Sequence, residues 1–395
     1  MKHQSDITRI IITALLSVTI NLPGQAIGNT TMDTVKSLFS PFWNAKVIKG
    51  ESLFFGQREP DGPLEAQLFY PVETILSFKS ATGETDFNEN EDYTIDKASG
   101  TVRLTPNSRI PSKSYEEMYP TENSKFSKML TFLNNTKSYI IYAEADFFHK
   151  LQVEVTYTTT AAWNGYVPEF AGSQLPNTLK KLKAKEPLKL CIAGDSISAC
   201  ANASKFTEAP PFQPAYGELV AKGLEYVYGT KIDFHNMAVG GWTSANGLHT
   251  IDKVADEKPD LVIIAFGMND ANKGQYAANT KAMMEKIRES SPQVEFILVA
   301  SMLSNKEWIL TGAPDRFPAF RDELTKLCGQ GTVLADMTSI WTELLKRKSF
   351  HDLTGNGVNH PNDFGHRLYA QVIVALLVSP ANQRGHISTA CCSNA

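Results

Sequence analysis

The residues of this sequence that could do chemistry lie in four short motifs. In chain order these are Gly194-Asp195-Ser196, the stretch from Asn236 to Thr243 with Gly240 and Gly241, Gly267-Met268-Asn269-Asp270, and His360-Pro361-Asn362. A serine hydroxyl becomes a strong nucleophile when a neighbouring imidazole takes its proton. Backbone N–H groups at glycine and an asparagine amide can stabilise an oxyanion. Together these groups would support nucleophilic attack on a carbonyl carbon.

Each motif alone has an ordinary structural explanation. Gly-Asp-Ser is usually a turn or a helix cap, paired glycines satisfy positive φ angles, and asparagine caps helices well. A single loop histidine is usually a surface residue. The prediction depends on the order of the motifs, because the serine, the glycine, the asparagine and the histidine follow successive elements of one predicted sheet.

The elements that must position these motifs begin near residue 188. Strand-like apolar runs occur at Leu188–Ala193, Ile232–Val239, Asp260–Phe266, Val294–Ala300 and Thr332–Met337. Helix-like segments occur at Tyr216–Tyr228, Leu248–Glu257, Asn279–Glu289, Arg316–Leu327, Ile340–Lys346 and Phe364–Leu377. Apolar strands that alternate with helices predict a parallel sheet covered on both faces. In such sheets the reactive loops follow the carboxyl ends of the strands.

The N-terminal part of the chain has a different pattern. Residues 45–160 contain short apolar or alternating runs separated by turn-rich stretches, which predicts a β-sandwich-like domain. The runs are Ala66–Tyr70, Thr74–Phe78, Tyr93–Asp96, Thr101–Thr105, Tyr139–Ala143 and Leu151–Tyr157. Residues 161–187 are expected to form a linker that carries a short helix from Asn177 to Lys185.

With all four motifs in this order, residues 188–380 resemble the SGNH (GDSL) hydrolase family, which is named after these four conserved residue types. The resemblance implies an α/β fold, a flavodoxin-like three-layer α/β/α sheet, preceded here by the all-β sandwich-like domain. It does not extend to the N-terminal residues.

The resemblance also implies roles for individual residues. Ser196 would be the nucleophile and His360 the general base. The backbone N–H groups of Ser196 and Gly241, with the side chain of Asn269, would form the oxyanion hole. Gly241 is preferred to its neighbour because the family's glycine stands two residues before a threonine, as Gly241 does.

The sequence departs from the family pattern at one position. The family usually has an aspartate three residues before the catalytic histidine, but position 357 is Gly357. Three explanations are open. Asp352 could reach back to orient the imidazole, a backbone carbonyl could hold the ring and leave a Ser-His dyad, or Asp363 and His366 could be the real pair.

The N-terminus has the pattern of a signal peptide over residues 1–26. Lys2 and Arg9 precede an apolar run from Ile10 to Leu22, and small residues follow near Ala26. That run is shorter than the roughly 20 residues that a membrane-spanning helix needs. We therefore expect a secreted or periplasmic protein with no integral membrane span, ending in a polar tail at residues 381–395.

Composition narrows the classes of partner. The net charge is −4 and the sequence has no long basic run, so a nucleic-acid partner is not expected. We find no zinc-ligand spacing, phosphate-binding loop or dinucleotide fingerprint, so no metal or cofactor is predicted. A Gly-x-Ser-x-Gly elbow around Ser196 is also absent, which argues against an α/β-hydrolase triad.

The expected function is that of an exported serine esterase that removes acetyl groups from a polysaccharide or oligosaccharide. The expected partner is an acylated carbohydrate or another ester. Trp242, beside the oxyanion glycine, is predicted to contact substrate, and Trp163 and Tyr166 are further candidates for glycan binding. The alternatives are a lipolytic or aryl esterase of the same family, and a non-catalytic glycan-binding protein on this scaffold.

Overall fold

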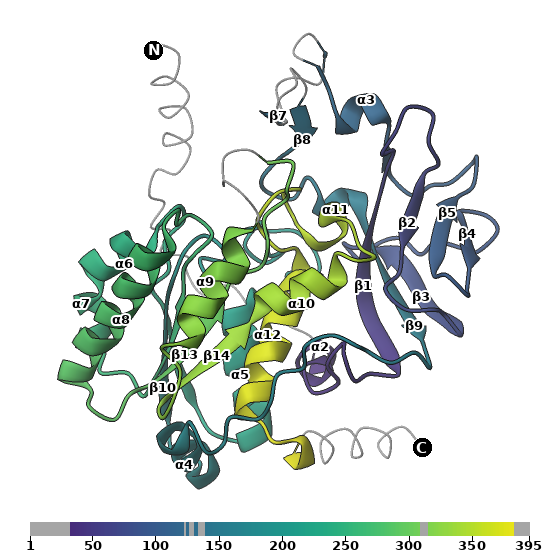
Figure 1. The fold of residues 1–395 in the computed structure, drawn as a ribbon. Helices are drawn as coiled ribbons and strands as arrows, with labels where there is room; N and C mark the ends of the chain where they lie inside the picture. Colours follow the sequence, from purple (N-terminus) through teal and green to yellow (C-terminus); the bar gives the residue numbers. More distant parts are fainter. Residues whose placement is uncertain (1–31, 122–123, 126–129, 133–138, 309–314, 383–395) are drawn as a thin grey trace, which may run out of the picture.

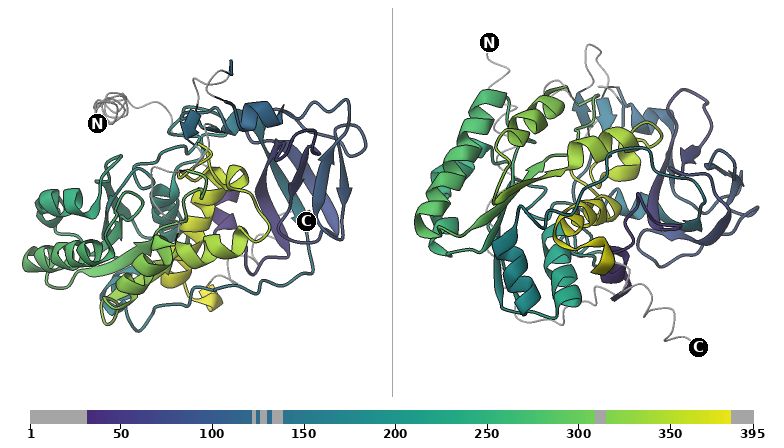
Figure 2. Two further views of the ribbon diagram at one scale, coloured as in Figure 1. Left: turned by 45° about the horizontal axis from the view of Figure 1, so that its top comes forward. Right: turned by 60° about the horizontal axis from the view of Figure 1, so that its bottom comes forward.

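A computed structural model describes residues 32–121, 124–125, 130–132, 139–308 and 315–382. A β-rich region, drawn in purple and blue in Figure 1, lies against one side of an α/β region, and the two further views agree (Figure 2). The predicted signal peptide and most of the predicted tail lie outside the described residues. Within those residues no helix is long and apolar enough to cross a bilayer.

The α/β region is built on a five-stranded parallel sheet with the order β11-β10-β12-β13-β14. Its strands are β10 (Leu188–Gly194), β11 (Ile232–Asn236), β12 (Leu261–Ala265), β13 (Glu295–Ala300) and β14 (Thr332–Asp336). Numbered along the chain, this order is 2-1-3-4-5, the flavodoxin-like arrangement. It confirms the predicted fold class, and all five predicted strands are found within a few residues of their expected ends.

Both faces of this sheet are buried, and successive strand residues point to opposite sides. In β10, Leu190 and Ile192 belong to one core cluster, while Cys191 and Ala193 belong to another. Residues of α5 (Tyr216–Tyr228) and α12 (Asp363–Leu377) pack in the first cluster. Residues of α7 (Asp252–Asp256), α8 (Lys273–Ser290) and α9 (Arg316–Thr325) pack in the second. The sheet therefore forms the middle of three layers.

The remaining helices are short. They are α2 (Met32–Ser37), α3 (Tyr115–Met118), α4 (Pro176–Ala184), α6 (Ser244–Thr250), α10 (Met337–Leu344) and α11 (Phe350–Leu353). Helix α12 begins where the side chain of Asn362 accepts a hydrogen bond from the amide of Gly365 at 3.0 Å, so Asn362 is its N-cap.

The β-rich region contains a four-stranded sheet, a three-stranded sheet and a small hairpin. The first has the order β3-β9-β1-β6 and the second β2-β5-β4. The strands are β1 (Val47–Gly56), β2 (Glu65–Gln67), β3 (Thr74–Ser80), β4 (Tyr93–Asp96), β5 (Thr101–Leu104), β6 (Ser112–Lys113), β7 (Leu130–Phe132), β8 (Tyr139–Ile141) and β9 (Gln152–Thr158). Sequence analysis located six of these strands and missed β1, β6 and β7. Strand β1 is buried along most of its length.

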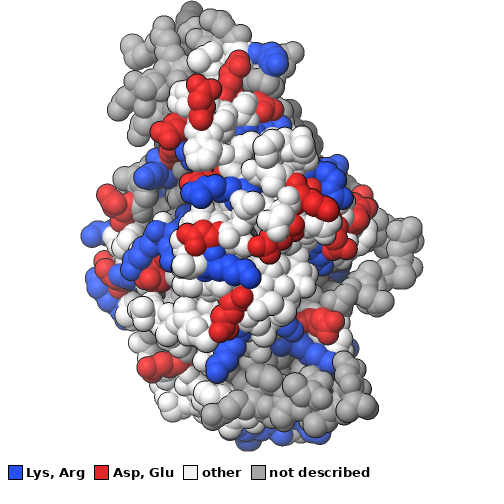
Figure 3. Space-filling view, turned by 90° about the vertical axis from the view of Figure 1, so that its right-hand side faces the viewer, with Lys and Arg blue, Asp and Glu red and all other residues white. Residues whose placement is uncertain are grey.

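The surface of the β-rich region that faces the viewer in Figure 3 carries side chains of both charges. Lys and Arg are interspersed with Asp and Glu across the part of this face that the structure describes (Figure 3). This pattern differs from the continuous basic stripe that would follow a phosphate backbone.

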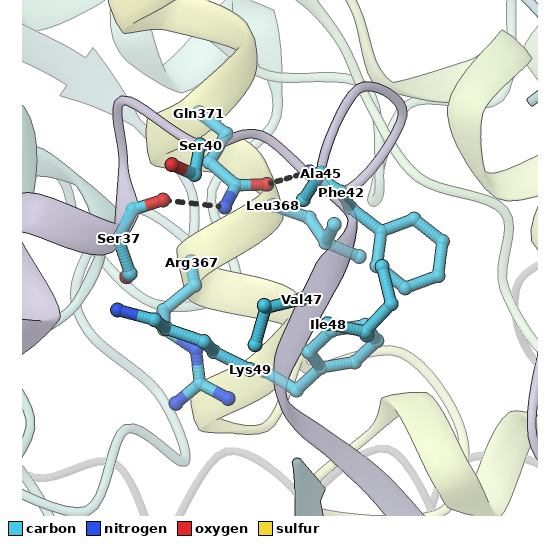
Figure 4. Close-up of a pocket in the computed structure, with 11 residues that line it drawn as sticks. Ser37, Ser40, Phe42, Ala45, Val47, Ile48, Lys49, Arg367, Leu368 and Gln371 are labelled. Carbon is cyan, nitrogen blue, oxygen red and sulfur yellow. Dashed lines mark hydrogen bonds between the residues drawn. The ribbon is translucent and has the colours of Figure 1, made fainter. Parts of the chain in front are cut away.

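The two regions share one continuous apolar core. Phe42, which follows α2, packs edge-on against Phe69 of the β-rich region and Phe364 of α12, with ring centroids 5.5 and 5.6 Å apart. Figure 4 shows how the same segment is held on α12, where the Gln371 amide bonds the backbone of Phe42 and Ser37 at 3.1 and 3.2 Å. The two regions are therefore docked firmly rather than loosely tethered.

A buried ion pair joins the regions at the same interface. The ammonium of Lys348 lies 2.7 Å from the carboxylate of Glu51 on β1, and both side chains are fully buried. The ammonium also donates to the carbonyls of Ser52 and Gln67, both at 2.9 Å, and the Tyr157 hydroxyl donates to Glu51 at 2.6 Å. Desolvation of two charges is offset only when such extra hydrogen bonds are present.

Replacing Lys348 by methionine would leave the Glu51 carboxylate buried without a cation. We expect Lys348→Met to lower the free energy of unfolding by about 3–5 kcal/mol. The matched control is Lys346→Met, whose partner Glu343 lies 2.6 Å away on the surface and whose loss should cost less than about 1 kcal/mol. Urea unfolding measures both values, and equal losses would contradict the prediction.

Candidate active site

The structure brings Ser196 and His360 into contact. The Ser196 Oγ lies 2.9 Å from the His360 Nε2, although the two residues are 164 positions apart. Ser196 follows β10, and a side chain at Gly194 would collide with the Ala265 carbonyl 2.7 Å away. The chain after Ser196 continues through turns and irregular backbone up to α5.

The second and third motifs lie beside the first because hydrogen bonds connect their loops. The Val239 amide donates to the Gly194 carbonyl at 3.0 Å, which continues the pairing between β11 and β10. The Asn269 Nδ2 donates to the Trp242 carbonyl at 3.0 Å. Gly241 has a φ of +77° and open space around its Cα, so its left-handed backbone rather than crowding favours glycine there.

Two buried carboxyl groups, those of Asp195 and Asp270, connect these loops through hydrogen bonds. Asp195 accepts hydrogen bonds from the amides of Ile197 and Met268, and burial raises the pKa of Asp195 to about 7. Asp270 accepts from the amide of Ser244 at 3.1 Å, and burial also raises its pKa. Their contacts hold the nucleophile, glycine and asparagine loops in one arrangement.

His360 lies in a loop that is organised by Asn356. The Asn356 Oδ1 accepts hydrogen bonds from the amides of Val358, Asn359 and His360 at 3.0 to 3.1 Å. The amide of Gly355 donates to the His360 carbonyl at 2.9 Å. The imidazole is therefore presented on a rigid loop, as a positioned general base requires.

Two side chains that sequence analysis did not identify face the other imidazole nitrogen. The Nδ1 of His360 lies 2.9 Å from the Asn202 Oδ1 and 3.2 Å from the Glu144 Oε2. Asn202 lies six residues after Ser196 but in no recognisable motif, and Glu144 lies in the β-rich region, 216 positions before His360. Only the fold shows that they meet the histidine.

Glu144 is ionised near neutral pH. Burial raises the pKa of Glu144, but hydrogen bonds and charge interaction with His360, and hydrogen bonds from Tyr142 and Asn356, outweigh it and place the pKa at about 2. The Tyr142 hydroxyl and the Asn356 amide reach its Oε1 at 2.6 and 3.1 Å. The carboxylate therefore keeps its negative charge beside the imidazole.

The structure does not place Asp352 beside His360. Its Oδ1 accepts a hydrogen bond from the Phe54 amide at 2.8 Å and its Oδ2 accepts one from the Ser349 amide at 2.7 Å. These contacts cap α11 and attach it to β1. The expectation that Asp352 orients the imidazole therefore fails, because backbone donors occupy both of its oxygens.

The alternative pair, Asp363 and His366, is also elsewhere. Asp363 accepts from the Ser204 amide at 2.8 Å. His366 is buried on α12, its Nε2 lies 3.2 Å from the Ala201 carbonyl, and burial lowers its pKa to about 4.

Position 357 could not hold the acid that the family usually has there. Gly357 has a φ of +82°, and a Cβ would lie 2.8 Å from the Phe148 ring and 2.9 Å from the Ile141 carbonyl. An aspartate would therefore meet both backbone strain and a collision. Phe148 and Ile141 both belong to the β-rich region.

The predicted aromatic contacts have different environments. Trp242 is half-buried and lines a cavity of about 300 Å³ together with Met237, Val239 and Phe266. Trp163 packs against Phe42 and Phe69, and its indole N–H donates to the Tyr166 carbonyl at 2.9 Å. Trp163 is therefore part of the packing between the regions and not an exposed glycan platform.

Comparison with known proteins identifies the α/β region. Residues 192–368 match the model of the GDSL-like Lipase/Acylhydrolase family. The match covers less than half of the chain, and within it the α/β region is similar to the members of that family. No curated protein matches the sequence. Among the residues that the structure describes, no cluster of three or more His, Cys, Asp or Glu could hold a metal ion.

Several solved structures are similar to this chain. One is a two-domain esterase (CEX) active on acetylated mannans, with 24% identity, 54% of each chain covered and a TM-score of 0.41. The match thus spans about half of that esterase. Another is an acetylxylan esterase from Geobacillus stearothermophilus, with 20% identity, 49% of this chain and 94% of the other covered, and a TM-score of 0.39. A lipase from a goat rumen metagenome has 16% identity, coverages of 48% and 97%, and a TM-score of 0.39.

The side chain of Asn269 is expected to donate to the oxyanion. We predict that Asn269→Ala lowers kcat by about 100- to 1,000-fold, or about 2.7–4 kcal/mol, because the lost donor acts mainly in the transition state. KM should change little. The control is Asn272→Ala, which removes the N-cap of α8 and should cost about 1 kcal/mol of stability without lowering kcat. A parallel loss of kcat in both variants would refute the assignment.

Proposed function

We propose that this hydrolase cleaves carboxylic esters through an acyl-enzyme on Ser196, with His360 as general base. The contact of 2.9 Å between Ser196 Oγ and His360 Nε2 carries the proposal. The Nδ1 faces two oxygen acceptors, so the proton resides on Nδ1 and leaves Nε2 free to accept. Nucleophile, base and tautomer are thus consistent with one mechanism.

The reaction would proceed in two steps. The Ser196 Oγ attacks the ester carbonyl while the His360 Nε2 takes its proton, then returns that proton to the departing alcohol. A water molecule, deprotonated by the same nitrogen, then releases the acid and restores Ser196. The N–H groups of Ser196 and Gly241 and the amide of Asn269 would hold the oxyanion in both steps.

The substrate that we propose is an acetylated polysaccharide or oligosaccharide. The site is polar beside its proposed base, since Glu144, which lies 3.2 Å from the His360 Nδ1, is exposed, and Asn269 is half-buried. Carboxylate and amide groups are suited to the hydroxyls of a sugar. The N-terminal signal-like pattern supports export, so the enzyme would meet such polymers as a secreted or periplasmic protein.

A lipolytic or aryl esterase is the second candidate, and one observation favours it. The cavity of about 300 Å³ beside Trp242 is lined by Met237, Val239 and Phe266 among others, and apolar walls of this kind suit an acyl chain or an aromatic ring. Ser196 does not line this cavity, and this separation favours an acetylated glycan over a long acyl chain.

Active-site labelling tests the nucleophile. We expect a fluorophosphonate probe to label the wild-type enzyme and not Ser196→Ala, because only a base-activated serine reacts at a useful rate. The control is Ser198→Ala, whose hydroxyl lies 2.6 Å from the Tyr216 hydroxyl in the interior and which should still be labelled. Equal labelling of wild type and Ser196→Ala would remove the proposed mechanism.

A substrate panel tests the substrate class. Acetate release from acetylated xylan, pectin and chitin is compared with hydrolysis of long-chain esters at equal enzyme concentration. The expected result is a higher kcat/KM on the acetylated glycans, since the site is polar beside its proposed base. A clear preference for long-chain esters would instead support the lipolytic alternative.

A further inference from the structure

The β-rich region fills the space beneath the loop that carries His360. The Phe148 ring and the Ile141 carbonyl lie where a side chain at Gly357 would be. Gln152 of β9 donates to the carbonyls of His351 and Thr354 at 2.7 and 2.8 Å. This region therefore excludes an acid at position 357 and supports the same loop from below.

The segment that follows β8 enters the site itself. The Asn202 Nδ2 donates to the Ala145 carbonyl at 3.0 Å, and Ala145 has a φ of +62° that turns the chain there. Next to it, Glu144 receives hydrogen bonds from Tyr142 and Asn356. Contacts from both regions thus fix this carboxylate against His360.

Asn202 and Glu144 supply different properties to the imidazole. The Asn202 Nδ2 donates to two carbonyls, those of Ala145 and Gly355, at 3.0 and 3.1 Å. Rotating this amide would point its oxygen at both carbonyls, so its Oδ1 must face the imidazole. Asn202 therefore sets the tautomer and orientation of His360 but carries no charge to stabilise an imidazolium.

We propose that Glu144, supplied by the β-rich region, is the carboxylate that stabilises the protonated His360 during ester hydrolysis, while Asn202 orients the ring. The two functions of a triad acid are thus divided between two residues. The Asn202 amide of the α/β region orients the ring, and the Glu144 carboxylate of the β-rich region supplies the negative charge. Glu144 acts through His360 and is a positioning residue. This inference rests on the proposed Ser196–His360 mechanism.

The other titratable groups around His360 do not take this role. Asp195 is fully buried beneath the nucleophile and interacts with the imidazole only through its charge. His366 lies on the adjacent α12, and burial lowers its pKa to about 4. When protonated it would be a cation, which cannot stabilise an imidazolium. Glu144 is the carboxylate in hydrogen-bonding range of Nδ1 among the described residues.

Glu144→Gln tests the charge while keeping the shape and the oxygen acceptor. We expect kcat on an acetate ester to fall about 10- to 100-fold, a moderate loss because the side chain is 45% exposed and screened by water. The acid limb of the kcat/KM profile should move to lower pH by about one unit. The sign follows because removing a nearby anion disfavours the protonated imidazolium form.

Two further variants test whether the effect depends on the negative charge at position 144. Glu144→Asp retains the charge and should keep the acid limb within about 0.3 unit of wild type, with a smaller loss of kcat. Glu116→Gln removes an exposed glutamate of the same region, on α3, and should leave both kcat and the pH profile unchanged. Thermal melting of each variant checks that the fold is intact.

The outcomes separate this inference from the proposed function. A wild-type pH profile and kcat in Glu144→Gln, with no activity in Ser196→Ala, would overturn the role of Glu144 and retain the Ser196 mechanism. A loss of kcat with an unmoved acid limb would show a merely structural effect and would also overturn it. Full activity in Ser196→Ala would overturn both.

Discussion

The seating of β1 and β9 against the α11–α12 segment is the interaction on which the rest of the site depends. Asp352 bonds the Phe54 amide of β1, and the Asn362 amide bonds Ser52 and Gln152 at 3.0 and 3.1 Å. All of these groups are buried. An unmade hydrogen bond in such a place costs about 1–3 kcal/mol, so the two regions hold each other in one register. The histidine loop lies between α11 and α12 and takes its position from this contact.

The layered fold and the principal reactive groups follow from local properties of the sequence. Strands that are buried on both faces are continuous apolar runs, and β10, β12 and β13 each have that character. A parallel sheet then requires the loops after β10, β11 and β12 to meet at one edge. This is why Ser196, Gly241 and Asn269 could be named together before their positions were known.

The remaining parts of the site depend on contacts that no local pattern records. Glu144 is an ordinary glutamate in a stretch after a short strand, and it meets His360 only because the β-rich region docks beside the histidine loop. Asp352 was the acid nearest in sequence to the histidine, yet two backbone amides bind it instead. The departure at Gly357 indicated only that the usual position holds no acid. It could not show which part of the chain lies beside the histidine instead. The atoms that a side chain at Gly357 would meet belong to residues more than 200 positions earlier.

The position of Glu144 also bears on what the β-rich region is for. An appended glycan-binding module would be expected to contact its hydrolase through a modest polar interface and to contribute nothing to the reacting groups. Here the interface contains a fully buried ion pair between Glu51 and Lys348, which is costly unless its geometry is fixed. That fixed geometry has a consequence at the site, since a shift of even 1 Å would separate Glu144 from Nδ1 beyond hydrogen-bonding distance. A tightly specified interface is what a catalytic site shared between two regions would require, so under the proposed role of Glu144 the β-rich region would be part of the catalytic unit.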